Sequence, residues 1–409
     1  MRAAGKMRVC MLSCSRPALS DPLYTKEAAS LAAAGLGVTI VAPCTQERDP
    51  LDASACLSDV RIIPLYIGNT GETARWRKLA ALPRLLAIAV SRECDVYHAI
   101  DPASLLVGAI AKVLRGRRLV YDAREHYPGA ISSNLGLGGR ATWLVFALLW
   151  LGESLLSLLA DHVFTVDQVG VRRFRQLRRS VSLLTNLPHR AFAPNDPALE
   201  PDHDGVRAPM EVLMLGISER LTPVVPILQA LRAVRTHGLD VHATLIGDSD
   251  EERRAAHLRL ANQLGVADAV RVIGWVPNAS VGAFLSQADC ALLLYRPTRV
   301  TVAMTNPVKL MEYMAFGLPI VCSDYPGLRS TVERLCCGVL VDALDAESIA
   351  RALTRLARDP ALRSGLGRNG RAAFQTNWNW EAQEPSFLAA YRAIRRAPTC
   401  RTGASTPGT

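Results

Sequence analysis

Residues 305–321 read TNPVKLMEYMAFGLPIV and combine a helix start, a helix, a helix stop and a strand in one short stretch. Asn306 is a good N-cap and Pro307 is favoured at the first helical position, so this pair predicts where the helix begins. Gly317 is expected to end the helix, and Pro319 opens the strand that follows. This order is typical of folds in which helices and strands alternate.

The same alternation continues on both sides of this stretch. Runs of β-branched and apolar residues are separated by segments of helical composition, such as residues 24–34, for which Gly35 is the expected C-cap. Predicted strands cover residues 8–13, 38–42, 95–99, 118–121, 162–166, 211–215, 242–246, 271–273, 290–294 and 319–322. Alternation of this kind predicts parallel sheets with helices on both faces and ligands at the carboxyl ends of the strands.

One segment, residues 194–209, interrupts the alternation. It reads PNDPALEPDHDGVRAP, is rich in Pro and Asp, and is expected to link two domains. A chain of 409 residues, 49% of them hydrophobic, exceeds the size at which a single core keeps growing. The expected domains are listed in chain order: an N-terminal Rossmann-like domain over 7–193, the linker over 194–209, a C-terminal Rossmann-like domain over 210–378, a helix over 379–396 and a disordered tail over 397–409.

The helix predicted to begin at Asn306 has the features of a phosphate site. A helix N-terminus presents free backbone N–H groups and a partial positive charge. Lys309 adds a full positive charge one turn further on, and Glu312 can accept hydrogen bonds from ribose hydroxyls on the same face. The alternative interpretation is an ordinary capped helix with an ion pair between Lys309 and Glu312.

The formal net charge of +10 would suit nucleic acid, an anionic membrane surface or a phosphorylated substrate. Zinc-finger spacing and aromatic-basic repeats are absent from the sequence, which argues against nucleic acid. The basic residues form a larger and a smaller cluster: Arg172, Arg173, Arg175, Arg178 and Arg179, then Arg115, Arg117 and Arg118. The larger cluster is interpreted as a solvated helix face, and a contact with membrane headgroups is the alternative.

Residues 141–160, ATWLVFALLWLGESLLSLLA, approach the length of a membrane span. Glu153 near the centre would be costly in a lone span, so a buried or interfacial helix is expected instead. Cys10, Cys290 and Cys322 lie in apolar runs and are expected to be buried thiols. No paired metal-ligand spacing and no signal-peptide pattern is present, so we expect reduced thiols, no structural zinc and a cytoplasmic enzyme.

The stretch 306–321, NPVKLMEYMAFGLPIV, resembles the donor-binding helix of family 4 glycosyltransferases of the GT-B fold, in particular the subset reading P-x-K-x-x-E-Y-M-A-x-G-x-P. Further segments resemble that family in the same order along the chain: 21–42, 94–102 (CDVYHAIDP), 119–128 (LVYDAREHYP), 216–221 (GISERL), 243–248 (ATLIGD), 270–294 and 377–391. The resemblance implies two Rossmann-like domains facing across a cleft, with the C-terminal helix crossing back to the N-terminal domain.

The resemblance also implies roles for single residues of the C-terminal half. Arg220 matches the basic residue that holds the donor diphosphate, and Glu312 matches the Glu that holds the ribose. Lys309 and the Asn306 backbone would lie near the diphosphate or the transferred sugar. Gly216 would let the backbone approach the ligand closely.

The chain departs from the family pattern mainly where the acceptor and the sugar would lie. Met304 stands at the position of the first Glu of the family's Glu-x7-Glu motif, and Arg124 replaces the His of the Y-D-x-H-E loop. The Gly-rich loop after the first strand is missing, since residues 13–21 read SCSRPALSD.

The candidates for catalytic acceptor contacts are Asp101, Glu125 and His126, with His98 as a weaker one. Each has a plain structural alternative. Asp101 precedes Pro102 and would cap a helix, His126 would be an ordinary loop residue, and His98 would be packed within its strand.

We therefore expect a retaining glycosyltransferase that moves a sugar from a UDP- or GDP-linked donor to a lipid-linked saccharide or another acceptor, in surface polysaccharide biosynthesis. The resemblance implies a metal-independent reaction in which the protein positions the reactants and stabilises the leaving diphosphate, with no cofactor beyond the donor itself. The expected location is the cytoplasm, at the inner face of the membrane. The alternatives are a nucleotide-sugar epimerase of the same fold and a catalytically weak nucleotide-sugar-binding subunit.

Overall fold

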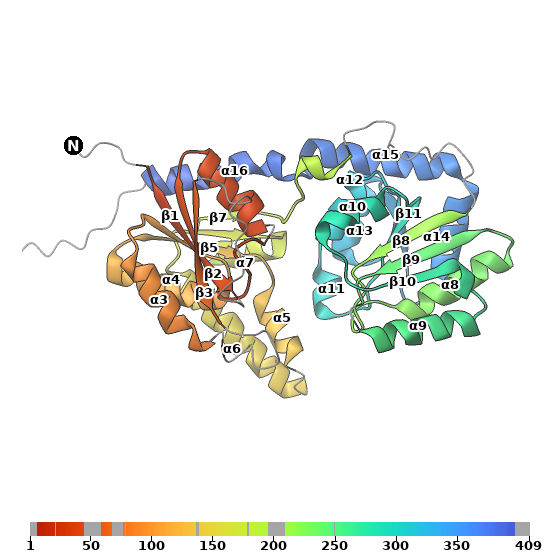
Figure 1. Cartoon of the computed structure of the whole chain (residues 1–409), viewed down its shortest axis with the longest axis horizontal. Coiled ribbons are helices and arrows are strands. Elements are labelled where there is room, and N and C mark those ends of the chain that lie inside the picture. The colour runs from red at the N-terminus through yellow and green to blue at the C-terminus, as the bar shows by residue number, and fades with distance from the viewer. Residues whose placement is uncertain are drawn as a thin grey trace, which may run out of the picture. The chain divides into compact units, whose positions relative to one another are not determined.

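The computed structural model describes residues 6–20, 22–44, 59–67, 77, 79–135, 139–177, 180–194, 209–248 and 250–396. They form two compact units: an N-terminal unit from Met1–Asn186 and Gln383–Thr409, and a C-terminal unit from Leu187–Ala382. Each unit is built on a parallel sheet with helices on both faces (Figure 1). The strands predicted from the sequence are all present, with small shifts at their ends.

The sheet of the N-terminal unit has the order β3-β2-β1-β4-β5-β6-β7. Its strands are β1 Arg8–Leu12, β2 Gly37–Cys44, β3 Val60–Tyr66, β4 Val96–Ala99, β5 Arg118–Ala123, β6 His162–Thr165 and β7 Val181–Leu183. Its helices are η1 Pro22–Ala28, α1 Ala29–Ala33, α3 Leu82–Ser91, α4 Pro102–Arg115, α5 Tyr127–Asn134, α6 Gly139–Ser157, α7 Gln168–Gln176 and most of α16, Trp380–Arg396.

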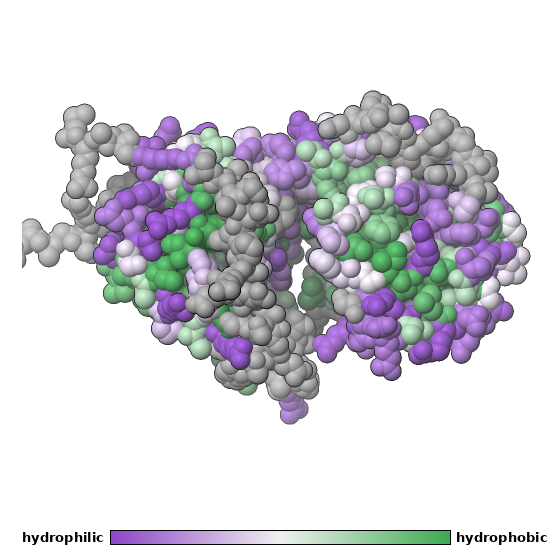
Figure 2. Space-filling model, viewed as in Figure 1, coloured by the Kyte–Doolittle hydropathy of each residue, from purple (hydrophilic) through white to green (hydrophobic). Residues whose placement is uncertain are grey.

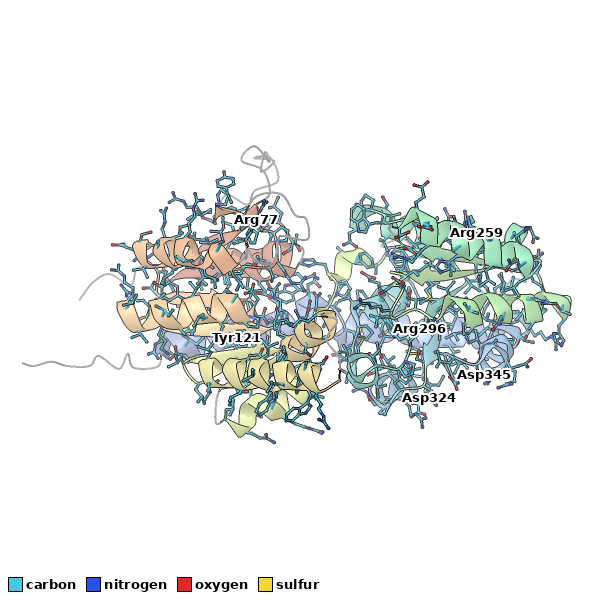
Figure 3. All side chains as sticks on the ribbon, turned by 90° about the horizontal axis from the view of Figure 1, so that it is seen from below. Arg77, Tyr121, Arg259, Arg296, Asp324 and Asp345 are labelled. Atoms are coloured by element: carbon cyan, nitrogen blue, oxygen red, sulfur yellow. The ribbon has the colours of Figure 1, made fainter. Side chains whose placement is uncertain are left out.

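Two neighbouring residues of β4 show how the helices divide between the faces of this sheet. Because successive side chains of a strand point to opposite faces, Tyr97 and His98 face different layers. The Tyr97 hydroxyl donates to the carbonyl of Ala89 in α3, whereas the His98 ring contacts the hydroxyl of Tyr391 in α16. Helices α3, α4 and α6 lie side by side on the Tyr97 face, which Figure 3 shows from below.

The sheet of the C-terminal unit has the order β10-β9-β8-β11-β12-β13. Its strands are β8 Met210–Leu215, β9 Val241–Ile246, β10 Val270–Ile273, β11 Cys290–Leu293, β12 Ile320–Ser323 and β13 Gly338–Val341. Its helices are η2 Arg190–Phe192, α8 Val224–Thr236, α9 Glu251–Gln263, η4 Ala267–Ala269, α10 Asn278–Leu285, α11 Arg299–Ala303, α12 Val308–Ala315, α13 Pro326–Leu335, α14 Ala346–Arg358 and α15 Pro360–Asn377.

Strand β8 contributes alternate residues to two separate cores in the C-terminal unit. Val212 and Met214 pack in the core that contains buried residues of α8 and α14. Leu213 and Leu215 pack in the core on the other face, which contains the buried side of α12. A strand buried on both faces reads as a continuous apolar run, which is why MEVLML was recognisable in the sequence.

Three strands that the sequence did not predict, β3, β7 and β13, lie at edges of the two sheets, whereas the fourth edge strand, β10, was predicted. Strand β3 contains Pro64, which lies opposite Ala42 of β2 and cannot donate a backbone hydrogen bond. Strands β7 and β13 are short. Short or proline-containing strands are common at edges because they discourage pairing with another chain, and the same properties weaken their signal in the sequence.

The boundaries of the units differ from the predicted domain limits. Residues 187–193 were expected in the N-terminal domain, but Leu187 and Ala193 are buried in a core of the C-terminal unit, and the ring of Phe192 packs against Phe316. The backbone N–H of Trp380 donates to the carbonyl of Pro188. The chain therefore passes between the units after Asn186 and again after Ala382. Most of the predicted linker, residues 195–208, and the predicted tail, 397–409, lie outside the described residues.

The apolar stretch predicted as a buried or interfacial helix forms α6 and the turn after it. None of the described helices is both long enough and apolar enough to span a membrane. The thiols of Cys10, Cys290 and Cys322 are buried in strands, as expected.

Candidate functional site

In the C-terminal unit, the strands β8, β9 and β10 each end at a glycine, Gly216, Gly247 and Gly274. Gly216 has a φ of +67° and Gly247 a φ of +118°, which residues with a side chain rarely adopt. A Cβ on Gly247 would lie only 2.8 Å from the Cα of Gly216. The backbones of two neighbouring loops therefore touch, with no side chain between them, at the end of the sheet where ligands bind in this kind of fold.

Lys309 of α12 lies directly over the loop that follows β8. Its Nζ donates a hydrogen bond of 3.1 Å to the carbonyl oxygen of Gly216, and a Cβ on Gly216 would come within 2.2 Å of that Nζ. Burial lowers the pKa of Lys309, and the nearby Glu312 carboxylate acts in the opposite direction. The glycine thus makes room for a half-buried ammonium group against the strand end.

A buried tyrosine fixes α12 at the centre of the sheet. The Tyr313 hydroxyl accepts a hydrogen bond of 2.9 Å from the N–H of Leu215 in β8 and donates one of 3.2 Å to the carbonyl of Leu292 in β11. Strand order reverses between β8 and β11, which is where open parallel sheets bind their ligands. Tyr313 therefore holds Lys309 and Glu312 of the same helix at this point. The sequence analysis missed this role, although Tyr313 belongs to the quoted E-Y-M-A motif.

The predicted start of this helix was wrong by one residue. The N-cap is Pro307, with extended backbone (φ −65°, ψ 143°), and α12 begins at Val308. Asn306 does not cap the helix, because its Oδ1 accepts a hydrogen bond of 3.2 Å from the Thr331 hydroxyl. Asn306 still lies close to the start of α12, as predicted, but its side chain links this loop to α13.

Arg220 lies on the turn after β8. The N–H groups of Leu221 and Thr222 both donate to the carbonyl of Ser218, which closes this turn. Arg296, labelled in Figure 3, supports it from the loop after β11, donating from its backbone N–H to Leu221 and from its Nε to Thr222. Arg220 is exposed and makes no ion pair with any residue that the structure describes. The turn thus presents a cation at the same sheet end as Lys309.

Asp101, predicted as a catalytic residue of the acceptor side, is buried, and both of its carboxylate oxygens accept hydrogen bonds within the N-terminal unit. Its Oδ1 accepts from the N–H of Ser104 and caps α4, which is the alternative considered from the sequence. Its Oδ2 accepts from the N–H groups of Cys14 and Ser15, at 2.8 and 3.0 Å, and from the Ser15 hydroxyl at 2.9 Å. The carboxylate thus joins the loop after β1 to the start of α4 in the crevice between β1 and β4.

Glu125 and His126 lie on the surface, just before α5. Glu125 pairs with Arg16, and the His126 ring stacks on Phe146 of α6 with centroids 6.1 Å apart. Both side chains are exposed, whereas that of Asp101 is buried.

His98 belongs to a buried ionic cluster that also contains Glu27, Asp122 and Arg124. Arg124 pairs with both carboxylates, while the His98 Nε2 lies 3.6 Å from Glu27 Oε2 and 3.9 Å from Asp122 Oδ2. Burial raises the pKa of Glu27 to about 8, although Arg124 opposes that shift, and burial lowers the pKa of His98. The carboxylates of Glu27 and Asp122 and the imidazole of His98 are close enough to share a metal ion. However, the Arg124 guanidinium already supplies positive charge to this cluster.

The replacement of His by Arg124 thus has a structural explanation. Its partner Asp122 belongs to the same loop motif, whereas its other partner, Glu27, is 97 residues away in sequence and could not be inferred from local pattern. Met304, the other departure, packs against the core beneath α12.

Two parallel-sheet units of this topology define the GT-B class of α/β proteins, and the fold predicted from the sequence is confirmed. Residues 212–359 match the family described as glycosyl transferases group 1, and residues 25–188 match the glycosyl transferase 4-like domain. The chain belongs to this glycosyltransferase family.

Similar proteins include the amylovoran biosynthesis glycosyltransferase AmsK of Erwinia amylovora, 29% identical over 177 residues that cover 43% of each chain. The chain thus spans less than half the length of this relative. A GDP-mannose-dependent α-(1-6)-phosphatidylinositol monomannoside mannosyltransferase of Mycolicibacterium smegmatis is 23% identical over 88% of this chain and 92% of its own. Among solved structures, Anabaena HepE in complex with UDP and glucose has a TM-score of 0.69 at 15% identity, over 95% of this chain and 100% of that one.

Proposed function

We propose that this chain is a retaining glycosyltransferase that transfers a sugar from a UDP- or GDP-linked donor to a lipid-linked saccharide or another acceptor, in surface polysaccharide biosynthesis. The observation that carries the proposal is the Lys309 ammonium held against Gly216 at the strand-order reversal of the C-terminal sheet. The similarity to AmsK and to a phosphatidylinositol monomannoside mannosyltransferase favours a polysaccharide or lipid-linked acceptor.

The donor would place its diphosphate beside Lys309 and Arg220, with the ribose hydroxyls on Glu312. Both cations come from the loop and the helix that border the end of β8, and Gly216 lets the diphosphate approach the backbone. Arginine can bind phosphate oxygens with two parallel hydrogen bonds, and lysine acts as a point charge. The similarity to a structure that holds UDP and glucose supports a nucleotide-sugar as the ligand.

The reaction would break the bond between the sugar C1 and the diphosphate oxygen and form a new bond from C1 to the acceptor oxygen on the same face. The proton of the acceptor hydroxyl would pass to the departing diphosphate. Lys309 and Arg220 would stabilise the negative charge on that leaving group, which is where the protein can lower the barrier most. We propose that this reaction needs neither a metal ion nor a further cofactor.

A lipid-linked acceptor requires the chain to work at a membrane surface, so we also propose peripheral contact with the anionic inner face of the cytoplasmic membrane. Of the three candidates for acceptor contacts, Asp101, Glu125 and His126, the side chains of Glu125 and His126 are exposed.

Calorimetric titration with UDP and GDP tests the donor site. We expect binding of at least one nucleotide, and Glu312→Gln should weaken it about tenfold by removing a charged acceptor of ribose hydrogen bonds. Glu333→Gln, on the exposed side of α13, is the matched control and should bind like the unaltered protein. If neither UDP nor GDP binds at millimolar concentration, the proposed function is wrong.

A further inference from the structure

Helix α6 turns polar residues inward and apolar residues outward. Its buried side chains are Glu153, Ser154 and Ser157. Its outward side chains are large and apolar: Trp143, Leu144, Leu148, Leu151 and Leu155 are 50–61% exposed. A helix on the surface of a globular protein normally has the opposite arrangement, so the outward face of α6 suits contact with something other than water.

A buried ion pair fixes this orientation of α6. Glu153 accepts hydrogen bonds from the Tyr121 hydroxyl and from Arg173, the latter at 2.6 Å. Arg173 also donates to the carbonyl of Trp150 and to the Ser154 hydroxyl. Rotating α6 to bury its leucines would break this network and leave a buried carboxylate without its partner, which is strongly destabilising.

The neighbouring helix α4 continues the apolar surface. Its residues Leu106, Ile110, Val113 and Leu114 are 38–73% exposed and recur at the spacing of one helical face. The two helices contact each other, and Lys112 of α4 donates to the carbonyl of Leu159 just beyond α6. Figure 3 shows the helices of this layer side by side. We call the outward sides of α4 and α6 together the α4–α6 surface.

The exposed charged residues within α4 and α6 are basic. The only acidic residue in either helix is the buried Glu153. Arg115 and Arg140 are exposed near the ends of the two helices, and Arg172 and Arg175 are exposed on α7, which contacts α6 through Arg173. Helix α9 of the C-terminal unit has the arrangement that is usual for a surface helix, since hydrophilic residues cover its outer side (Figure 2).

We infer that the α4–α6 surface docks on an anionic lipid bilayer, with its leucines at the acyl boundary and its arginines on the headgroup phosphates. Tryptophan is favoured at that depth, and each basic residue near an anionic surface adds to the attraction. The inference rests on the membrane contact proposed above and names the surface that makes it. Pairing with a second copy would bring the basic residues of both surfaces together, whereas an anionic bilayer complements them.

Flotation with lipid vesicles tests the surface. We expect the protein to float with phosphatidylglycerol–phosphatidylethanolamine vesicles, and the double variant Leu148→Gln/Leu151→Gln to reduce the partition coefficient at least about tenfold. The matched control is Leu258→Gln/Leu344→Gln, at leucines of the C-terminal unit that are 40% and 47% exposed, and it should float normally. All these side chains are on the surface, so thermal unfolding should be little changed.

The charge dependence gives a second test. Binding should weaken on neutral phosphatidylcholine vesicles and as salt rises from about 50 to about 500 mM. Arg140→Gln/Arg172→Gln should reduce binding to anionic vesicles, whereas Arg259→Gln/Arg351→Gln, at exposed arginines of the C-terminal unit, should not.

Three outcomes would overturn the inference: no flotation with anionic vesicles at low salt, normal flotation of the Leu148/Leu151 variant, or a dimer that this variant converts to a monomer without loss of flotation. The third outcome would show that the α4–α6 surface contacts a second copy of the chain and not a bilayer. Titrating UDP and GDP into the same samples separates this inference from the proposed function. Loss of vesicle binding with intact nucleotide binding would overturn the docking surface only, and the reverse result would overturn the donor site only.

Discussion

The two units place corresponding loops at the centre of their sheets but use them differently. In the N-terminal unit the loop after β1 meets the residues after β4, and in the C-terminal unit the loop after β8 meets the residues after β11. The first pair is joined by the Asp101 carboxylate, which accepts hydrogen bonds from the amides of Cys14 and Ser15. The second pair has Lys309 beside Gly216 and the exposed Arg220 on the following turn.

This difference supports the proposal that the C-terminal unit binds an anion from outside. Backbone amides and positive groups at the carboxyl end of a parallel sheet attract negative charge. The N-terminal unit satisfies its amides with a carboxylate of its own. The C-terminal unit offers cations and glycines at the equivalent place, so an external diphosphate can fill the role that Asp101 has in the other unit.

The largest effect is expected from removing the cations of the C-terminal unit. Lys309→Ala and Arg220→Ala should each cost about 2–4 kcal/mol of transition-state stabilisation, which lowers kcat/KM for the donor about 30- to 1000-fold. Initial rates of donor hydrolysis or sugar transfer would measure this loss. Arg351→Ala, at a surface residue of α14, serves as the control and should keep full activity. Turnover that stays near normal in both variants would refute the assignment of the diphosphate site.

Removing the internal anion of the N-terminal unit should change stability instead. Asp101→Ala is expected to lower the free energy of unfolding by about 2–3 kcal/mol, because buried amides lose their acceptor and α4 loses its cap. Asp345→Ala removes the cap of α14 together with an exposed ion pair to Arg351, and should cost about 1 kcal/mol. Chemical denaturation would measure both, and titration with UDP or GDP should give unchanged affinity. Weaker nucleotide binding by Asp101→Ala would contradict the division of roles between the units.

The buried ionic cluster around Glu27 predicts that the stability of the N-terminal unit depends on pH. The pKa of Glu27 is raised to about 8 in the folded protein, so the folded state holds a proton there that the unfolded state has released at neutral pH. Stability should therefore fall as pH rises from about 7 to about 8, by up to about 1.4 kcal/mol per pH unit. His98 has a lowered pKa and contributes its own change only below that window.

Denaturation of Glu27→Gln at several pH values checks this expectation. The variant cannot titrate at this position, so its stability should depend less on pH between 7 and 8 than that of the unaltered protein. Identical slopes for the two proteins would show that Glu27 is ionised in both states and that Arg124 outweighs its burial.

The smallest effect is expected from replacing single glycines of the C-terminal unit by Ala. Gly216 and Gly238 both have positive φ, +67° and +77°, so replacement of either by Ala should cost about 1 kcal/mol of stability. A Cβ at Gly238 meets nothing within 4 Å, whereas a Cβ at Gly216 collides with Lys309. Only Gly216→Ala should therefore weaken nucleotide binding as measured by calorimetry. Equal affinity in the two variants would mean that Lys309 does not need its place over Gly216.

Much of the fold could be predicted because buried parallel strands and their terminal glycines leave a local signal. MEVLML followed by Gly216 is such a signal, and the motif around Lys309 and Glu312 gave the C-terminal candidate site. Three of the four edge strands gave little signal, because β3 contains Pro64 and because β7 and β13 are short.

The remaining details depend on contacts between distant parts of the chain. His98 and Tyr391 are 293 residues apart in sequence, yet their side chains are in contact. The hydrogen bonds of Asp101 to Cys14 and Ser15 also join distant parts of the chain and cannot be inferred from local pattern. Likewise, Asn306 has the residue type of an N-cap, but Thr331 of another helix competes for its side chain.

The return of α16 to the N-terminal unit has a consequence for biosynthesis. Phe387 and Tyr391 are buried beside Phe164 and His98, so the core of the N-terminal unit lacks these side chains until the ribosome has passed the whole C-terminal unit. Residues 187–382, in contrast, form a continuous segment that is complete earlier. Domains commonly fold in the order of their synthesis. Here the unit whose translation begins first is the one whose core is completed last.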